Sequence, residues 1–317
     1  MAIEDRIRDA IENGKNKAGE ILAGRAAARE RRQAALQQNP RALSFNVQLA
    51  AAAPGVAPAT VTTAGYLAAL GDSWFDYPFH DVLKELEDGH GYSVESTAHK
   101  GDPIEKMAYV GGQMDDFARK LEKIQARGAV PKAVLISGGG DDVAGNEFGM
   151  LLNHADSPIA GWNDDVVAGL VNLGERIYTA YHTMIAGVQA IFVQYFPARE
   201  LHVLVHGYDY PVPDGRGFFG GWPFPGPWLE PGFREKNFTD LQARIDLMRT
   251  LMDQFNTLVA SLAVPNVNIH YLDLRNTLST VLAGDAYQQD WANELHPTEK
   301  GFAAVANKFA AVLNTIP

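Results

Sequence analysis

Cysteine is absent from this chain of 317 residues. The absence excludes a disulfide framework, a thiolate nucleophile and a zinc site with cysteine ligands. It leaves the cellular compartment open, because a chain of this length buries enough apolar surface to be stable without disulfides. Any nucleophilic catalysis must therefore use a different side chain.

Long apolar runs and an excess of basic residues are also missing. No stretch of about 18 consecutive apolar residues is present, so no membrane span is expected. Residues 1–32 carry eight basic and six acidic side chains and no apolar core. This is unlike a secretory signal, and we expect a cytoplasmic protein. The formal net charge of −11 argues against a nucleic-acid partner, since phosphate binding needs a clustered basic surface.

The residues that are present divide the chain into three parts. Residues 1–40 form an expected N-terminal helical extension, in which apolar side chains recur at helical spacing over residues 2–37. Glycines weaken this helix, which is either a docked surface helix or an arm for homo-oligomerisation. Residues 41–64 are rich in Ala, Pro and Thr and are expected to be a linker. Residues 65–317 are expected to form the main domain.

The main domain alternates short apolar runs with helical patterns. This alternation indicates βαβ units, and we predict a three-layer α/β/α sandwich around a parallel sheet of about five strands. Residues 190–196, at the end of one helical pattern, fit either a helix or a strand. Strands are expected at Tyr66–Leu70, Tyr92–Ser96, Ala133–Ile136, His202–Val205 and Val267–Leu272, and helices at 81–86, 113–127, 164–195, 239–263 (capped by Thr239) and 299–313.

Three short segments have the chemistry of one site. Residues 71–74 read Gly-Asp-Ser-Trp after the first expected strand, residues 138–142 read Gly-Gly-Gly-Asp-Asp after the third, and residues 293–298 read Asn-Glu-Leu-His-Pro-Thr before the last helix. The carboxyl ends of parallel strands meet at one edge of a sheet, where active sites of such folds lie. A serine at a strand end needs a base to take its proton as it attacks. Ser73 is therefore the candidate nucleophile.

In these segments the chain resembles the SGNH (GDSL-type) hydrolases, a superfamily of esterases, lipases, thioesterases and carbohydrate deacetylases. The first block matches Gly71-Asp72-Ser73, the second matches Gly101, the third matches Gly139-Gly140-Asp141-Asp142, and the last matches Asn293 to Pro297. The order and spacing agree over residues 66–315. The resemblance implies a flavodoxin-like α/β/α fold, ester hydrolysis, and His296 as the general base.

Asn293 departs from the family pattern, which has aspartate at this position. An amide cannot stabilise an imidazolium as a carboxylate does. Asp290 or Glu294 from the same loop, a backbone carbonyl near residues 291–293, or more remotely Asp209 could orient the ring instead. We favour Asp290 narrowly over the backbone carbonyl.

Asp141 is the second departure, because the family has an asparagine that donates to the oxyanion. An ionised carboxylate has no donor and repels developing negative charge. Either Asp141 is protonated in a desolvated site and donates its O–H, or it points away and the backbone N–H groups of Ser73 and Gly101 act alone. The oxyanion hole is thus expected at Ser73, Gly101 and Asp141.

Residues 208–233 contain eight aromatic side chains among many glycines and prolines. Proline and glycine disfavour regular structure, so we expect an irregular flap over the active-site cleft. The flap is either a self-packed loop or a substrate-binding lid, with an apolar wall for acyl or aryl groups or a stacking platform for sugars. The residues expected to bind substrate are Trp74, Tyr208, Tyr210 and Trp222.

Together these residues predict a serine ester hydrolase that acts through an acyl-enzyme on a small-molecule, lipid or carbohydrate ester. No metal site is convincing, and no cofactor is expected. Two alternatives stay open. One is a weak or inactive ligand-binding protein on the same fold, and the other is an acyltransferase whose flap excludes water.

Overall fold

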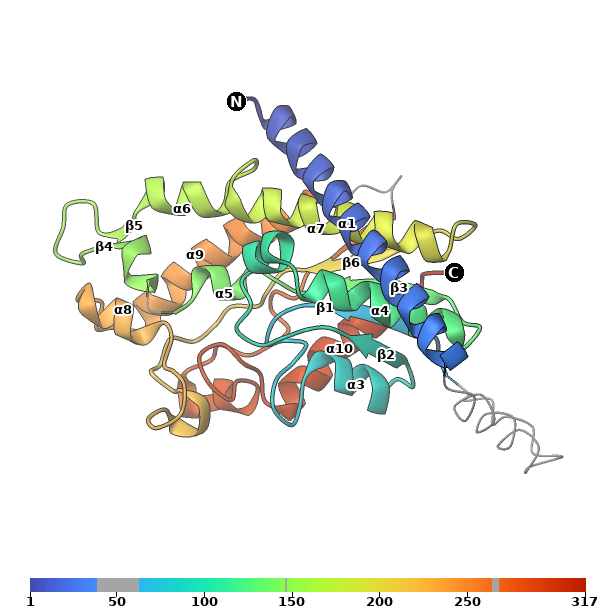
Figure 1. Ribbon diagram of the computed structural model, residues 1–317. Coiled ribbons are helices and arrows are strands. Elements are labelled where there is room, and N and C mark those ends of the chain that lie inside the picture. Colours follow the sequence, from blue (N-terminus) through green and yellow to red (C-terminus); the bar gives the residue numbers. More distant parts are fainter. Residues whose placement is uncertain (39–62, 146, 264–267) are drawn as a thin grey trace.

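The computed structural model describes residues 1–38, 63–145, 147–263 and 268–317. Its main sheet has five parallel strands in the order β2-β1-β3-β6-β7 (Figure 1). Counted along the chain, this is the 2-1-3-4-5 order of flavodoxin-like folds. The predicted fold class is therefore confirmed. The strands are β1 (Tyr66–Leu70), β2 (Ser93–Ser96), β3 (Pro131–Ile136), β6 (Val203–His206) and β7 (Ile269–Leu272).

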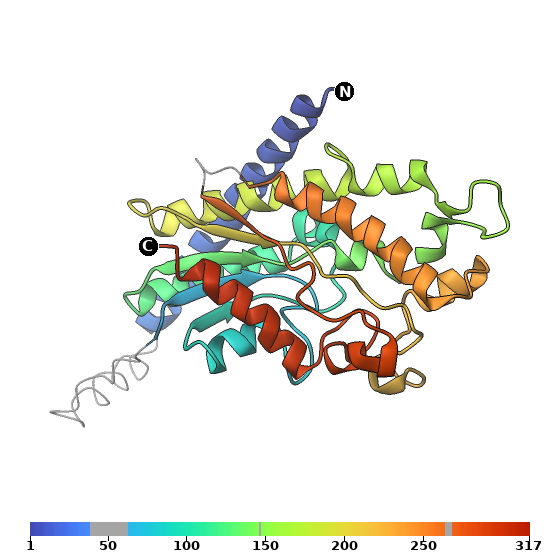
Figure 2. The ribbon, with the colours of Figure 1, turned by 180° about the vertical axis from the view of Figure 1, so that it is seen from behind.

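Helices cover the sheet on both sides. Helices α4 and α7 contact each other on one side, and α3 contacts α10 on the other (Figure 2). Helix α9 packs against β6 and β7. The helices are α1 (Ile3–Gln38), α3 (Val82–Asp88), α4 (Gln113–Ala126), α5 (Gly140–Val143), α6 (Asp164–Val171), α7 (Arg176–Tyr195), α8 (Glu230–Glu235), α9 (Leu241–Ala260) and α10 (Glu299–Leu313), and β4 (Leu152–Asn153) pairs with β5 (Gly161–Trp162) in a small hairpin outside the sheet.

Several predicted boundaries need correction. The helical pattern over 164–195 is two helices, and Gly174 lies between them with a φ of 82°. Residues 190–195 are the end of α7, so the strand alternative is wrong. Asp240, not Thr239, caps α9, because its side chain accepts from the Ala243 N–H. The start of the last predicted strand, Val267, lies outside the described residues.

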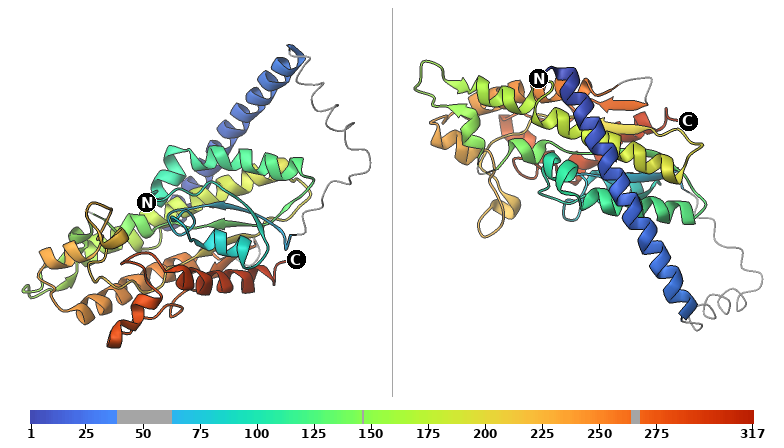
Figure 3. Two further views of the ribbon diagram at one scale, coloured as in Figure 1. Left: turned by 90° about the horizontal axis from the view of Figure 1, so that it is seen from below. Right: turned by 45° about the horizontal axis from the view of Figure 1, so that its top comes forward.

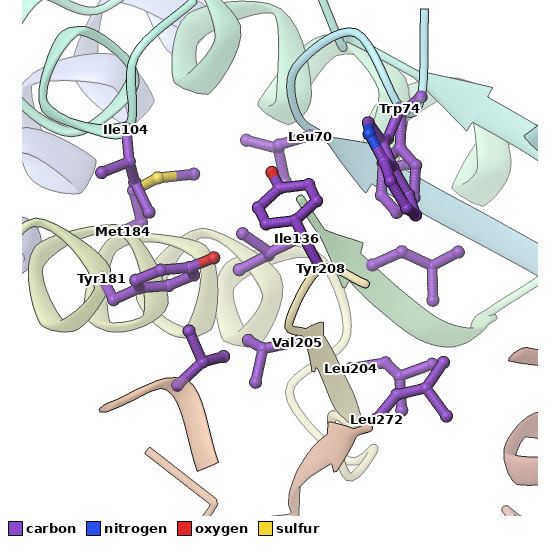
Figure 4. Packing of buried hydrophobic residues seen from close by; sticks show 14 of the residues in the cluster. Leu70, Trp74, Ile104, Ile136, Tyr181, Met184, Leu204, Val205, Tyr208 and Leu272 are labelled. Carbon is purple, nitrogen blue, oxygen red and sulfur yellow. The ribbon is translucent and has the colours of Figure 1, made fainter. Parts of the chain in front are cut away.

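The core lies between the sheet and its helices. Strands β1, β3 and β6 are buried on both faces over most of their length, which explains their continuous apolar runs, whereas the edge strand β2 is half-buried. Figure 4 shows Leu70 and Ile136, from neighbouring strands, close to Tyr208, and Trp74 nearby. These side chains form the apolar floor beneath the carboxyl ends of the strands.

Helix α1 crosses the outer face of α7 (Figure 3). Ala10, Ala18 and Ile21 are buried in the contact. Gly14 permits the crossing, because a Cβ there would lie 2.2 Å from the Thr183 carbonyl oxygen. The predicted helix over 2–37 is confirmed, whereas residues 41–62 of the predicted linker lie outside the described residues.

Candidate active site

Ser73 lies just after β1, in a turn that is held from below. The carboxylate of Asp72 accepts from the Trp74 N–H at 3.0 Å and from the Ser137 hydroxyl at 2.7 Å. Its other oxygen accepts from the Tyr208 hydroxyl. Both backbone groups of Gly71 bond to the side-chain amide of Gln113. These contacts leave the Ser73 side chain as the member of the turn that faces the cleft.

His296 lies opposite this hydroxyl, in the loop that precedes α10. Its Nε2 is 2.8 Å from the Ser73 Oγ. The Trp74 indole N–H donates to the Leu295 carbonyl at 3.1 Å, which ties the serine turn directly to the histidine loop. Thr298 caps α10 by accepting from the Gly301 N–H. The structure thus brings together two side chains that are 223 residues apart.

The chain has the flavodoxin-like α/β/α fold that the resemblance to SGNH hydrolases implies. The order of its sheet, the serine after the first strand and the histidine before the last helix are the arrangement that the motif resemblance implies. This arrangement identifies the fold only. Whether the site can catalyse a reaction depends on the side chains around Ser73.

The Nδ1 of His296 faces the side chain of Asn293. The Asn293 Oδ1 lies 3.0 Å from Nδ1 and also accepts from the backbone N–H groups of Leu295 and His296. The Asn293 Nδ2 donates to the Tyr77 hydroxyl at 2.9 Å. Because the oxygen meets three nitrogens and the amide nitrogen meets a hydroxyl, the amide can have only this orientation. It therefore requires a proton on Nδ1 and leaves Nε2 as an acceptor for the serine.

The preference for Asp290 as the orienting residue is corrected by this geometry. Its carboxylate accepts from the Ser279 N–H and pairs with Lys300. Glu294 accepts from four backbone N–H groups at residues 215 and 228–230. Asp209 accepts from those of Tyr210 and residues 276–278. Each proposed substitute thus holds a loop, and the side chain of Asn293 itself orients the ring.

Burial lowers the pKa of His296 to about 3. The ring is stacked on Tyr77 with centroids 4.1 Å apart and is only 5% exposed. A buried imidazole next to a neutral amide gains no charge compensation on protonation, and desolvation then favours the neutral form. At neutral pH the ring is therefore unprotonated at Nε2, as a general base must be.

Gly101 and Asp141 lie on the same cavity as Ser73 and His296. Gly101 has a φ of 78°, a left-handed conformation that glycine adopts without strain. Burial and, after it, the nearby charges of Asp72 and Asp142 together raise the pKa of Asp141 to about 7, although the backbone N–H of Gly101 partly offsets the rise. The Asp141 Oδ2 is buried and has no hydrogen-bond partner within the described ranges. Asp141 is thus a carboxyl group that is partly protonated at neutral pH.

Asp142 points elsewhere. Its carboxylate accepts from the Ile104 N–H at 2.7 Å. Burial, partly offset by this hydrogen bond, raises the pKa of Asp142 to about 6. Asp142 therefore supports the segment that follows Gly101, whereas Asp141 faces the cavity.

Two cavities meet at Ser73. The outer cavity, of about 420 Å³, is lined by Ser73, Gly101, Asp141 and His296 and by aromatic side chains of the flap: Phe218, Phe224 and Trp228. The inner cavity, of about 50 Å³, lies on the other side of the serine. It is lined by Trp74, Tyr208, Leu229, Trp291, Leu295 and side chains of α9. Ser73, Asp141 and Leu295 border both cavities.

Of the four aromatic residues expected to bind substrate, two line a cavity at Ser73 and two do not. Trp74 and Tyr208 line the inner cavity. Tyr210 borders neither cavity, since its hydroxyl donates to Asp253 and its ring lies under the Arg249 guanidinium. Trp222 also borders neither cavity and is 94% exposed.

The flap is more regular than the sequence predicts. Residues 218–220 form one 3₁₀ turn, and α8 begins at Glu230. Trp228 is one of the eight flap aromatics but is not among the four residues expected to bind substrate, and the stacking of Tyr77 on His296 is not predicted by the sequence. A signal existed for Tyr77, because it follows Ser73 by four residues in an aromatic-rich stretch.

Within residues 1–38, 63–145, 147–263 and 268–317, no group of three or more His, Asp or Glu side chains is placed to hold a metal ion. None of the helices in these ranges combines the length and apolar content that a membrane span requires.

Comparison with known proteins found similarity only among solved structures. No family model and no curated protein matches the chain. A putative acylhydrolase from Bacteroides fragilis matches with 12% identity over 81% of this chain and 91% of its own, with a TM-score of 0.42. A GDSL-like lipase from Bacteroides thetaiotaomicron matches with 11% identity over 78% and 87%, with a TM-score of 0.40.

A catalytic mutant of an acetylxylan esterase from Geobacillus stearothermophilus is also similar, with 16% identity over 80% of this chain and 95% of its own and a TM-score of 0.40. Identities and TM-scores as low as these do not identify an activity. The assignment of chemistry depends on the residues around Ser73.

Proposed function

We propose that the chain is a serine hydrolase of carboxylic esters, with Ser73 as nucleophile and His296 as general base. The observation that carries the proposal is the 2.8 Å contact between the Ser73 Oγ and a histidine nitrogen that must be an acceptor. A serine hydroxyl becomes a useful nucleophile when an oriented base lies within hydrogen-bond reach. Here the orientation comes from Asn293, which itself is held by Tyr77.

The first half-reaction forms an acyl-enzyme. The Ser73 Oγ attacks the ester carbonyl carbon while its proton moves to the His296 Nε2. The tetrahedral intermediate then collapses, and the bond between carbon and the alcohol oxygen breaks. The proton on Nε2 passes to that oxygen, and the alcohol leaves.

The second half-reaction uses water. The His296 Nε2 takes a proton from water as its oxygen attacks the acyl carbon. Collapse of the second intermediate breaks the bond to the Ser73 Oγ, which recovers the proton from Nε2. The carboxylic acid leaves, and the enzyme returns to its starting state.

The oxyanion of both intermediates lies beside Ser73, Gly101 and Asp141 in this proposal. The backbone N–H groups of Ser73 and Gly101 are two donors. Protonated Asp141 supplies the third, and its raised pKa supports this role because a substantial fraction carries the proton near pH 7. When Asp141 is ionised, the negative charge opposes the oxyanion instead.

The amide at position 293 also favours a second candidate function, in which the protein binds a ligand with little turnover. Asn293 orients the ring but adds no negative charge beside the imidazolium that forms during catalysis. In a serine protease, replacing the aspartate by asparagine lowers kcat by about 10⁴. A ligand-binding protein with little or no turnover is therefore the second candidate function.

Hydrolysis of nitrophenyl esters by purified protein separates the two candidates. We expect turnover in the wild type, and a loss of at least about 1,000-fold in Ser73→Ala and in His296→Ala. Ser261→Ala, at the C-terminal end of α9, is the matched serine control and should retain full activity. Equal residual rates in wild type and Ser73→Ala would reject the hydrolase and leave a binding protein.

A further inference from the structure

The two cavities at Ser73 differ in their relation to His296. The histidine lines the outer cavity and does not line the inner one. Ser73 and Asp141 border both. An ester bound at Ser73 places its two substituents on opposite sides of the carbonyl carbon, so each cavity can take one of them.

The chemistry decides which substituent enters which cavity. The leaving alcohol must receive its proton from the His296 Nε2, so the alcohol oxygen must lie on the histidine side. That side is the outer cavity. The acyl group then extends away from the histidine, into the inner cavity.

We propose that the inner cavity is an acyl site that limits the substrate to esters of short, uncharged acids, of about two to four carbons. The proposal rests on the hydrolase function above and adds the class of its substrate. A cavity of about 150 Å³ holds one benzene molecule, whereas the inner cavity has about 50 Å³. Longer chains do not fit unless its walls move.

The walls belong to the packed core. Met248, Met252 and Phe255 come from α9, and all three are at most 3% exposed. Leu229 and Trp291 close the cavity from the flap and from the histidine loop. A close-packed core cannot accommodate an extra methylene without displacing neighbouring side chains.

The polar groups of the wall exclude a charged acyl chain. Asp72, Asp141 and Asp209 line the cavity. The oxygens of Asp72 and Asp209 already accept from the protein, whereas the Oδ2 of Asp141 has no partner within the described residues. The remaining surface is mostly apolar. An acyl group with its own carboxylate would meet these negative charges without a cation to pair with, so a dicarboxylate half-ester should be a poor substrate.

The outer cavity suits a larger alcohol. Its volume of about 420 Å³ lies in the range of small-molecule sites, and Phe218, Phe224 and Trp228 give it flat apolar walls. Aryl alcohols and sugar rings both present faces that stack on such walls. The site therefore combines a strict requirement for the acid with a permissive one for the alcohol.

A chain-length series tests the proposal. Acetate, butyrate, hexanoate and octanoate esters of one nitrophenol are compared by kcat/KM. Each methylene beyond the cavity should lower kcat/KM by about tenfold, so octanoate, with four carbons more than the longest acid proposed to fit, should be about 10,000-fold poorer than butyrate.

Two variants should move this profile in opposite directions. Met252→Ala enlarges the cavity and should shift the preference toward hexanoate. Ala144→Leu places more volume at the cavity wall and should lower butyrate turnover while acetate turnover persists. Gln254→Ala, on the exposed side of α9, is the control and should keep the wild-type profile.

The outcomes separate failure of this proposal from failure of the hydrolase itself. Equal kcat/KM for acetate and octanoate, with all turnover lost in Ser73→Ala, would overturn the acyl site and keep the hydrolase. An Ala144→Leu variant that folds and hydrolyses butyrate as well as the wild type does would also overturn it. No Ser73-dependent turnover of any ester would remove the proposed function first.

Discussion

At the scale of single residues, the orientation of His296 is the least expected feature of the site. The family acid position holds an amide, yet three nitrogens and the Tyr77 hydroxyl allow that amide only one orientation. The ring thus has the tautomer that a base requires. What the site lacks is a negative charge beside the imidazolium.

Asn293→Asp supplies that charge, and we expect kcat to rise by about tenfold or more. The carboxylate accepts the same N–H groups and stabilises the imidazolium that forms in the transition state. Asn293→Ala, which removes the acceptor, should lower kcat. Steady-state rates for the three proteins, measured on one ester, test this order; a fall in kcat for Asn293→Asp would show that the amide is required.

Asp141 predicts a falling alkaline limb of the pH–rate profile. Its protonated form donates to the oxyanion below a pKa of about 7, and its ionised form repels the oxyanion above it. kcat/KM should therefore fall as pH rises through about 7. His296, with a pKa of about 3, should keep the acidic side flat down to about pH 4. In Asp141→Asn the amide donates at every pH, so the alkaline limb should disappear.

The same carboxyl group makes the stability of the fold depend on pH. Its folded pKa, about 7, lies above its ordinary value of 3.8, so the folded state binds the proton more tightly than the unfolded state does. This stabilisation is complete below about pH 4 and is lost as pH rises through about 7. Asp141→Asn should therefore raise the melting temperature more at pH 8 than at pH 5. Equal shifts at both pH values would contradict the raised pKa.

The sequence predicts that Ser73 and His296 meet, because strand ends and the last loop of a parallel sheet lie at one edge. It does not predict which side chain accepts from the Nδ1–H of His296. Asp290 is three residues closer to the start of that loop than Asn293 and carries the right charge, but its side chain turns toward Lys300. Which side chain faces the ring depends on the backbone N–H groups of residues 295 and 296, and periodicity contains no information on them.

At the scale of elements, the flap and the histidine loop are one unit joined by Glu294. Its buried carboxylate accepts from four flap N–H groups, at Gly215, Trp228, Leu229 and Glu230. Burial raises its pKa, and these hydrogen bonds partly offset the rise. The composition of residues 208–233 predicts an irregular segment over the cleft, but not the side chain that holds it.

Glu294→Ala should loosen the flap and destabilise the protein. Each buried N–H group left without an acceptor costs about 1–3 kcal/mol. We expect a lower denaturation midpoint and faster proteolysis within residues 214–228. Glu230→Ala, which keeps the N–H group and changes a different carboxylate of the same segment, is the control. Unchanged proteolysis of the Glu294 variant would separate the flap from the loop.

At the scale of the whole molecule, α1 is fastened to the domain by one close helix crossing. Gly14 lies against the backbone of α7 at Thr183 and Gly187, and ion pairs of Arg6 with Glu175 and of Arg25 with Glu122 flank it. Helical periodicity predicts α1 itself. It does not predict the crossing point, because a glycine in a helix looks like a weakness until its neighbour is known.

A pair of matched glycine variants tests the crossing. Gly14→Ala places a Cβ 2.2 Å from the Thr183 carbonyl oxygen, so α1 must shift and its release by limited proteolysis should become faster. Gly19→Ala meets nothing within 4 Å and should stabilise the helix by about 0.5–1 kcal/mol. If both variants behave alike, the crossing is not what holds α1.

The pairing of Ser73 with His296 is tested most directly by covalent labelling with a fluorophosphonate, located by peptide mass spectrometry. An activated serine displaces fluoride from the reagent, whereas the other serines of the chain are inert to it. We expect one adduct per chain, on Ser73, and its loss in His296→Ala. An adduct on a different residue, or labelling of Ser73 that is unchanged without His296, would contradict this pairing.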